Sequence, residues 1–437
     1  MTVEEPDLAG VVQESPAGTR TFATGTIKVG AGLIVSGAAN YVFASIATRA
    51  MGPARFAEFN IFWGLVFGLG LGVFFPFEQE VSRRASHAYA AGRSGLVLRR
   101  TAFRLAVVVA LVLSVLTYPV AAVLLHGTDV LPLWSATALA FLVLAVAYVS
   151  RGGLSGRTLF GRYGAQLGAE AVLRLGAAVV LFAVGVSSPW PFALTVPVAL
   201  AVAVAVSVPR DSSTAEPEPV QRAALVRSVG AVAVGAVAAQ SLINLGPVAV
   251  TVLAGPGEKA LAGSFLAAAL IARMPIFAFA AVQAVLIPGL VRAVTEHRRT
   301  DFARSLALVL ATTAALGALG VLACAVAGPA LLHLLAGAEY DLPATDIALL
   351  AVAVALYLLA MVLQPAALSL GRHQAAMVPW IACAVSFPLL LLLPVDPIRA
   401  VGLALDGAGA VAVAGLAVVV VRGWRAPWPA QDVEPTR

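Results

Sequence analysis

The chain has 437 residues, of which 60% are hydrophobic and only 11% are charged. Because soluble domains carry about 25% charged residues, this composition excludes a water-soluble globular protein and is typical of a polytopic membrane protein. The formal net charge of +6 would suit nucleic acid, but the distribution of the basic residues along the chain explains it better, so no nucleic-acid binding is expected.

The predicted elements are helices throughout, so the expected fold class is an all-α polytopic membrane protein. Residues 1–26 are polar and lack the basic start and apolar core of a signal peptide, which predicts a disordered cytoplasmic tail. About twelve spans follow, since about 20 apolar residues cross a bilayer. In the first half we expect them at residues 27–50, 57–78, 103–125, 131–150, 165–187 and 190–208. In the second half we expect them at residues 228–254, 262–289, 304–327, 343–369, 375–394 and 400–421.

A polar segment rich in Pro, Ser and Glu interrupts the apolar pattern near the middle of the chain. This composition is typical of a flexible linker, so residues 209–227 are predicted to join two lobes on the cytoplasmic side. The N-terminal six-helix lobe would cover residues 27–208 and the C-terminal six-helix lobe residues 228–421. Residues 422–437 would form a second cytoplasmic tail.

The basic residues indicate the orientation of the spans. With the N-terminus inside, 22 of the 28 Lys and Arg residues fall in predicted cytoplasmic segments and four in predicted external loops. The positive-inside rule requires such a bias, which predicts that both termini are cytoplasmic.

The chemistry of ATP hydrolysis and of metal binding is absent from the sequence. Neither Lys28 nor Lys259 lies in a phosphate-binding loop, so no ATP is expected to bind. Cys324 and Cys383 are isolated in apolar stretches, and the five histidines form no cluster. No cofactor and no metal are therefore expected. No large loop offers room for an active site, so the chain is expected not to be an enzyme.

A few ionisable residues fall inside predicted spans, where function is the first hypothesis because charge is costly there. Glu170 and Arg174 are four residues apart and can pair on one helix face. The pair either orients the helix or belongs to a cavity for an anionic headgroup. Arg273 lies two residues before Pro275, at a predicted kink, where its planar guanidinium could hold a phosphate.

Polar residues in the two halves occupy matching places. Asn40 precedes a Gly-Pro pair by 12 residues, and Asn244 precedes another by 11. They either bind sugar hydroxyls in a cavity or hold helices together. Asp406 has no basic neighbour within one turn and is a candidate coupling-ion site, unless it lies in the hydrated interface.

Two further carboxylates lie at the cytoplasmic end of the second span. Glu78 and Glu80 are close in sequence to Arg83 and Arg84, which predicts a local salt-bridge network.

Three stretches resemble the Wzx-type polysaccharide flippases of the multidrug/oligosaccharidyl-lipid/polysaccharide (MOP) exporter superfamily. The first contains Arg49, the turn Met51-Gly52-Pro53 and an aromatic-rich second span with Phe56, Phe59 and Phe62. The second runs from Arg151 to Leu175 and includes Glu170 and Arg174. The third runs from Gly263 to Ala293, with Arg273, Pro275 and Pro288.

The resemblance implies two six-helix lobes around a central cavity, opened alternately to either side of the cell membrane. It implies a lipid-linked oligosaccharide as substrate, with membrane lipids and the machinery of cell-envelope polysaccharide synthesis as partners. The pyrophosphate would contact Arg174 and Arg273, and Arg49 would be a third cation near the external mouth. Asn40 and Asn244 would contact the sugars.

Two alternatives stay open. A cation-coupled multidrug or metabolite antiporter of the same superfamily would use buried carboxylates, for which Glu170 and Asp406 are the candidates. An integral-membrane enzyme of cell-wall glycan synthesis would need an acidic or histidine cluster in a large loop.

Overall fold

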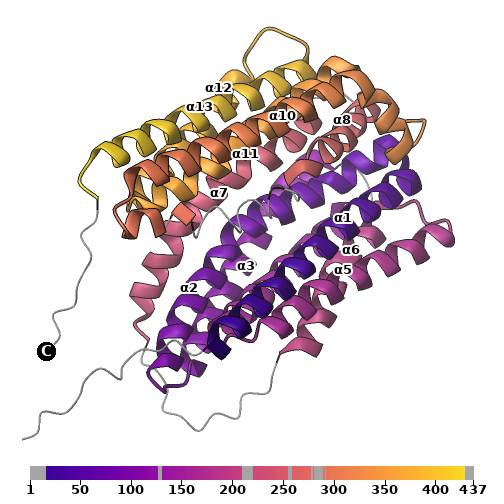
Figure 1. The fold of residues 1–437 in the computed structure, drawn as a ribbon. Coiled ribbons are helices and arrows are strands. Elements are labelled where there is room, and N and C mark those ends of the chain that lie inside the picture. Colours follow the sequence, from indigo (N-terminus) through magenta and orange to yellow (C-terminus); the bar gives the residue numbers. More distant parts are fainter. Residues whose placement is uncertain are drawn as a thin grey trace, which may run out of the picture.

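The structure, a computed structural model, describes residues 16–125, 130–208, 220–253, 258–276, 279, 289–290 and 292–428. The elements of the described residues are helices, which confirms the all-α fold class. Figure 1 shows the orange and yellow helices of the second half gathered beside the indigo to magenta helices of the first half. Two lobes that follow the chain order are therefore visible.

The first two predicted spans form a hairpin. Helix α1 (Pro16–Gly64) is interrupted at Gly52, whose φ of 70° is a left-handed value that glycine adopts at little cost. The chain reverses direction there. This is seen in the contacts across the turn, where the ring of Phe43 lies 6.1 Å from that of Phe59 and 5.9 Å from that of Trp63. The helix begins at Pro16, inside the segment that the sequence predicts as a disordered tail.

The rest of the N-terminal lobe consists of a short π-helical segment and five α-helices. Their bounds are η1 (Leu65–Gly70), α2 (Leu71–Ala90), α3 (Leu96–Leu124), α4 (Val130–Gly156), α5 (Phe160–Ala183) and α6 (Pro189–Ser207). The described helices of the second half are α7 (Arg222–Leu253), α8 (Lys259–Ala272), α10 (Arg299–Ala336), α11 (Ala344–Ser369), α12 (His373–Leu390) and α13 (Pro397–Arg425).

The predicted spans coincide with these helices. Among the described residues, 11 segments are long and apolar enough to cross a membrane, and the first, Ser36–Ala90, contains both arms of the hairpin. Each of the predicted spans thus has a helical counterpart among the described residues, although residues 277–278 and 280–288 of the span predicted at 262–289 lie outside them. The bounds differ at the linker, of which residues 209–219 lie outside the described residues, while α7 already begins at Arg222. Helix α13 continues to Arg425, into the predicted second tail.

The outermost helices bury a face of small residues and expose large apolar ones. In α3 the buried positions Ala102, Ala106 and Ala110 recur every four residues, which lets neighbouring helices approach closely. On the opposite side Val115 is 70% exposed, and in α10 Val326 is 77% exposed. An apolar surface of this kind suits contact with lipid.

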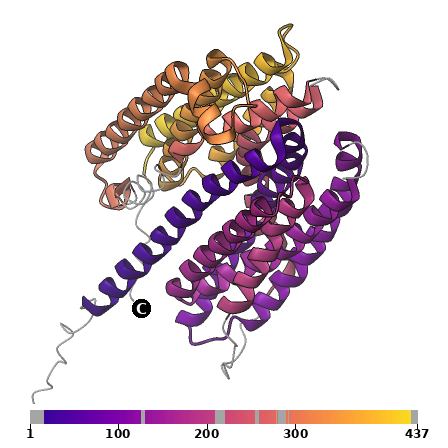
Figure 2. The ribbon, with the colours of Figure 1, turned by 90° about the vertical axis from the view of Figure 1, so that its right-hand side faces the viewer.

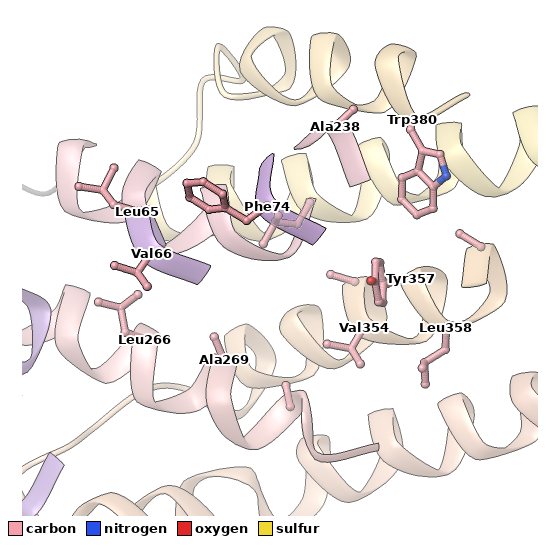
Figure 3. Packing of buried hydrophobic residues seen from close by; sticks show 14 of the residues in the cluster. Leu65, Val66, Phe74, Ala238, Leu266, Ala269, Val354, Tyr357, Leu358 and Trp380 are labelled. Atoms are coloured by element: carbon pink, nitrogen blue, oxygen red, sulfur yellow. The ribbon is translucent and has the colours of Figure 1, made fainter. Parts of the chain in front are cut away.

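The boundary between the lobes is formed by α1, η1 and α2 on one side and by α7 and α8 on the other. A methyl group at Gly68 would lie 2.9 Å from Cβ of Asn244, and one at Gly72 would lie 2.8 Å from Cα of Val237. Glycines thus allow α7 to approach α2 closely. Figure 2 shows α1, in indigo, running between the two groups of helices. Figure 3 shows Val66 and Phe74 in one hydrophobic cluster with Ala238 and Leu266.

Candidate functional site: a buried ion network and a cavity between the lobes

A row of polar side chains follows one face of α5. Gln166, Glu170 and Arg174 are spaced four residues apart, so they lie above one another on the helix. The Arg174 side chain is only 1% exposed, and its guanidinium carbon lies 5.6 Å from the ring centre of Phe43 in α1. The row therefore faces the interior of the N-terminal lobe.

Glu170 bridges two arginines. Nη1 of Arg174 donates to its Oε1 at 3.4 Å, and Nη2 of Arg151 donates to its Oε2 at 2.9 Å. The pairing of Glu170 with Arg174 confirms the prediction from their spacing. The second partner was not predicted.

The predicted span 131–150 ends one residue before Arg151, so the sequence predicts that this arginine lies in a cytoplasmic segment. Helix α4 continues to Gly156 instead, and Arg151 is buried. Gly152 beside it permits this burial, since a methyl group there would lie 2.7 Å from the backbone oxygen of Glu78. The glycine pair after Arg151 was the signal in the sequence that α4 packs closely at this point.

Glu78 belongs to the same buried region. Its Oε1 accepts a hydrogen bond of 2.7 Å from the hydroxyl of Tyr163, and Arg151 is close enough to attract its carboxylate. The predicted local network is therefore wrong for Glu78, whose side chain points to other helices. Two arginines and two glutamates from α2, α4 and α5 thus form a buried network with balanced formal charges.

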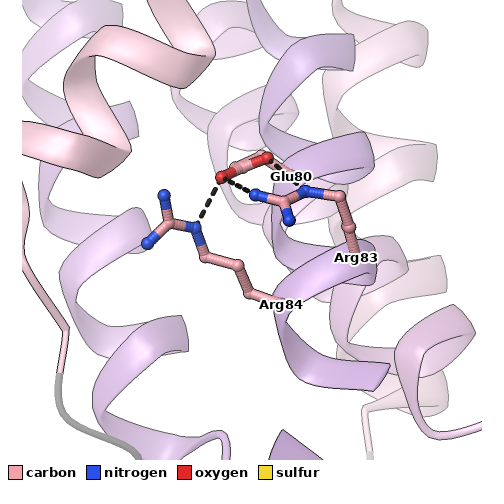
Figure 4. A network of polar contacts seen from close by, with 3 residues as sticks. All are labelled: Glu80, Arg83 and Arg84. Atoms are coloured by element: carbon pink, nitrogen blue, oxygen red, sulfur yellow. Dashed lines mark hydrogen bonds and ion pairs between the residues drawn. The ribbon is translucent and has the colours of Figure 1, made fainter. Parts of the chain in front are cut away.

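The local network is confirmed for Glu80. Its carboxylate accepts from Nη2 of Arg83 at 2.8 Å and from Nε of Arg84 at 2.5 Å, as Figure 4 shows. This cluster lies in the middle of α2, and its arginines are partly exposed. Glu80 thus pairs with arginines of its own helix, whereas Glu78 contacts Tyr163 of α5.

The buried network keeps unused hydrogen-bonding capacity. Within the described part of the chain, Nε and Nη2 of Arg174 and both polar atoms of the Gln166 side chain have no hydrogen-bond partner. The same holds for Oδ1 of Asn40, which lies one turn from Phe43 on α1. Buried polar atoms are rarely left unpaired, so these donors and acceptors can hold water or a polar ligand.

A cavity lies at the boundary of the lobes, among α1, α8 and the end of α10. Its volume is about 220 Å³, and its walls include Tyr41, Ser45, Thr48, Leu270 and Leu335. Two of its lining residues, Val42 and Met274, are 48% and 37% exposed, so the cavity opens to the apolar outer surface of the helix bundle.

Arg273 lies beside this cavity. It is half-buried where α8 ends, and it is close enough to Tyr41 and Tyr357 for their hydroxyls to interact with its charge. Tyr41 also lines the cavity. Arg273, which the sequence predicts as a phosphate-binding residue, therefore lies beside an apolar cavity between the lobes.

The other predicted site residues are dispersed. Asn244 is buried at the contact of α7 with η1, and its Nδ2 donates to the backbone oxygen of Gln240 at 3.0 Å. Arg49 is exposed and donates to the backbone oxygen of Leu334 in α10. Asp406 is half-buried in α13, and its Oδ1 has no hydrogen-bond partner among the described residues. The structure thus brings Arg174 and Glu170 together, places Asn40 on α1 one turn from Phe43, and places Arg273 and Asn244 separately at the lobe boundary.

The lobes are joined at the end of the bundle that is predicted to face outside. Nζ of Lys259 in α8 lies 3.5 Å from Oε1 of Glu58, and the hydroxyl of Tyr340 donates to the backbone oxygen of Thr48 at 2.8 Å. A methyl group at Gly263 would lie only 1.9 Å from the backbone oxygen of Pro53. The contact of α8 with the α1 hairpin is therefore too close for any side chain at this glycine.

The sequence and the fold were compared with those of known proteins. No protein-family model matches the chain. A MATE family transporter of the MOP superfamily in an inward-facing conformation superposes with a TM-score of 0.65 at 15% identity, covering 88% of this chain and 93% of that one. The outward-facing conformation gives a TM-score of 0.63 at 12% identity, covering 91% and 94%. The chain has the fold of the MATE transporters. This confirms the two-lobe fold predicted from the resemblance.

Two further comparisons extend the likeness. A MOP superfamily transporter from Pyrococcus furiosus, described as having a binding pocket of reversed polarity, superposes with a TM-score of 0.62 at 13% identity, covering 92% of this chain and 94% of that one. An uncharacterised protein of Mycobacterium tuberculosis is 28% identical over 420 residues, covering 90% of this chain and 91% of its own. Another from the same organism is 28% identical over 405 residues, covering 88% of each.

Proposed function

We propose that this multi-pass membrane protein flips a lipid-linked oligosaccharide or polysaccharide precursor across the cytoplasmic membrane by alternating access. The observation that carries the proposal is the cavity between α1 and α8, which opens to the apolar side of the protein next to Arg273. A lipid chain suits its apolar walls, and a pyrophosphate suits the guanidinium beside them. A soluble substrate has no need of a lateral apolar opening.

The buried network has a different part in this proposal. Because Glu170 occupies Nη1 of Arg174, only Nε and Nη2 of this arginine are open to an anionic group. On α1, Oδ1 of Asn40 is a further buried acceptor without a hydrogen-bond partner among the described residues. We assign Arg273 the first contact with the pyrophosphate, and Arg174 a contact that forms as the lobes move.

A cation-coupled antiporter is the second candidate. The solved structures with this fold include multidrug transporters of the MATE family, and the half-buried Asp406 carboxylate has an oxygen without a hydrogen-bond partner in the described part of the chain. In that mechanism Glu170 and Asp406 would bind the coupling cation.

Transport by reconstituted protein distinguishes the two. In liposomes, we expect the wild type to move a fluorescent lipid-pyrophosphate-linked oligosaccharide between leaflets, and Arg273→Ala to reduce the rate by about 10-fold or more through loss of a charge-assisted contact of about 1.5–3 kcal/mol. Arg304→Ala, at an exposed position of α10, is the matched control and should keep the wild-type rate. Export of a soluble cation driven by sodium or protons, without lipid movement, would establish the antiporter instead.

A further inference from the structure

A second cavity lies on the N-terminal lobe, away from the boundary of the lobes. It is a groove of about 230 Å³ between α3 and α4, closed at one side by Val208 just after α6. It shares no lining residue with the cavity beside Arg273. It lies at the end of the helices that the charge distribution predicts to face the cytoplasm.

Three arginines surround the part of this groove that is nearer to the predicted cytoplasmic ends of the helices. Arg99 and Arg100 come from the first turn of α3, and Arg157 follows the end of α4. A methyl group at Gly153 would lie 2.9 Å from Cδ of Arg99, so the stem of this arginine lies across α4. The Arg157 guanidinium carbon lies 5.5 Å from the ring centre of Tyr89. Of the described residues that line the groove, none is a carboxylate.

The part of the groove that is farther from the predicted cytoplasmic ends of the helices is apolar and continues onto the lipid-facing surface. Its walls include Phe103, Val146 and Val149. Phe103 and Val208 are each 42% exposed, as expected for side chains that contact lipid. The groove therefore combines cations at the level of the membrane interface with an apolar surface directed into the bilayer.

We propose that this groove binds an anionic phospholipid of the cytoplasmic leaflet. Its phosphate contacts Arg99 and Arg100, and its acyl chains lie along Phe103 and Val146. Arginine pairs with phosphate through two parallel hydrogen bonds. In a zwitterionic lipid the cation of the headgroup partly neutralises the charge of the phosphate, so an anionic lipid should bind more tightly. Basic pockets between membrane helices on the cytoplasmic side are suited to such headgroups.

Lipid binding to the full-length protein tests this proposal. We would titrate the detergent-purified protein with phosphatidylglycerol and with phosphatidylcholine, and count bound lipids by native mass spectrometry. The wild type is expected to retain phosphatidylglycerol preferentially. The double variant Arg99→Gln/Arg100→Gln is expected to bind it about 30-fold more weakly, the equivalent of about 1 kcal/mol for each arginine. Arg104→Gln/Arg304→Gln removes two exposed arginines outside the groove and should leave the affinity unchanged.

A second variant and a second ligand make the test independent of charge alone. Val146→Trp fills the apolar part of the groove and keeps the arginines, so it should also abolish the preference for phosphatidylglycerol. Inorganic phosphate should bind far more weakly than the lipid. The proposal is overturned if the wild type shows no preference, if both groove variants keep it, or if phosphate alone binds as well as phosphatidylglycerol.

Discussion

Alanine in place of Arg151 is expected to destabilise the protein more than loss of any exposed arginine. The substitution removes the 2.9 Å contact to Glu170 and the cation that attracts Glu78, so two buried carboxylates lose a counter-charge. Breaking a buried ion pair by removing one partner costs about 3–5 kcal/mol. Thermal and denaturant unfolding of the detergent-purified protein would measure the loss.

Two controls separate this effect from a general loss of charge. Arg304→Ala, at an exposed position of α10, should change the free energy of unfolding by less than about 0.5 kcal/mol. The double variant Arg151→Met/Glu78→Gln removes one cation and one carboxylate and leaves Glu170 paired with Arg174, so it should recover part of the lost stability. A single Arg151→Ala variant as stable as the wild type would show that the network contributes nothing to folding.

Gly263→Ala is expected to prevent the lobes from closing at the end predicted to face outside. The added methyl group would lie 1.9 Å from the backbone oxygen of Pro53, a backbone atom that cannot rotate away. The α1 hairpin and α8 must therefore separate. Because the proposed alternating access requires each end to close in turn, transport should fall to the background rate. Gly176→Ala is the matched control, since nothing lies within 4 Å of the methyl group it would add.

The separation itself can be observed by chemical labelling. Ser264 is 3% exposed beside this contact, so a cysteine at this position should react slowly with a membrane-impermeant maleimide. The native Cys324 and Cys383 would first be replaced by alanine. Adding Gly263→Ala should raise the labelling rate several-fold. Equal labelling rates with and without Gly263→Ala would refute the expectation that this substitution separates α8 from the α1 hairpin.

The sequence predicts those features of the fold that depend on local patterns. Span positions follow from runs of apolar residues, and the pairing of Glu170 with Arg174 follows from their spacing on one helix. Glu78 and Tyr163 are 85 residues apart, and their contact depends on how α2, α4 and α5 are arranged in space, which no local pattern contains. Arg151 was missed because hydropathy ends a span at the first charge, whereas a paired charge can stay inside the helix bundle.

The cavity beside Arg273 was beyond sequence reasoning for a related reason. Its walls come from α1, α8 and α10, helices that are far apart in the chain. The sequence identified Arg273 from the proline that follows it, but the apolar surroundings arise only when the lobes meet.

The π-helical segment η1 has a consequence for insertions and deletions in this chain. A π-turn contains one residue more than an α-turn, so the segment Leu65–Gly70 accommodates an additional residue between the helical residues on either side of it. Shortening the chain by one residue here would convert the segment to ordinary α-helix. The same deletion between Phe74 and Glu78 would turn one helix face by about 100° relative to the other and carry Glu78 away from Tyr163. Length variation among homologues should therefore be tolerated at η1 and avoided along α2.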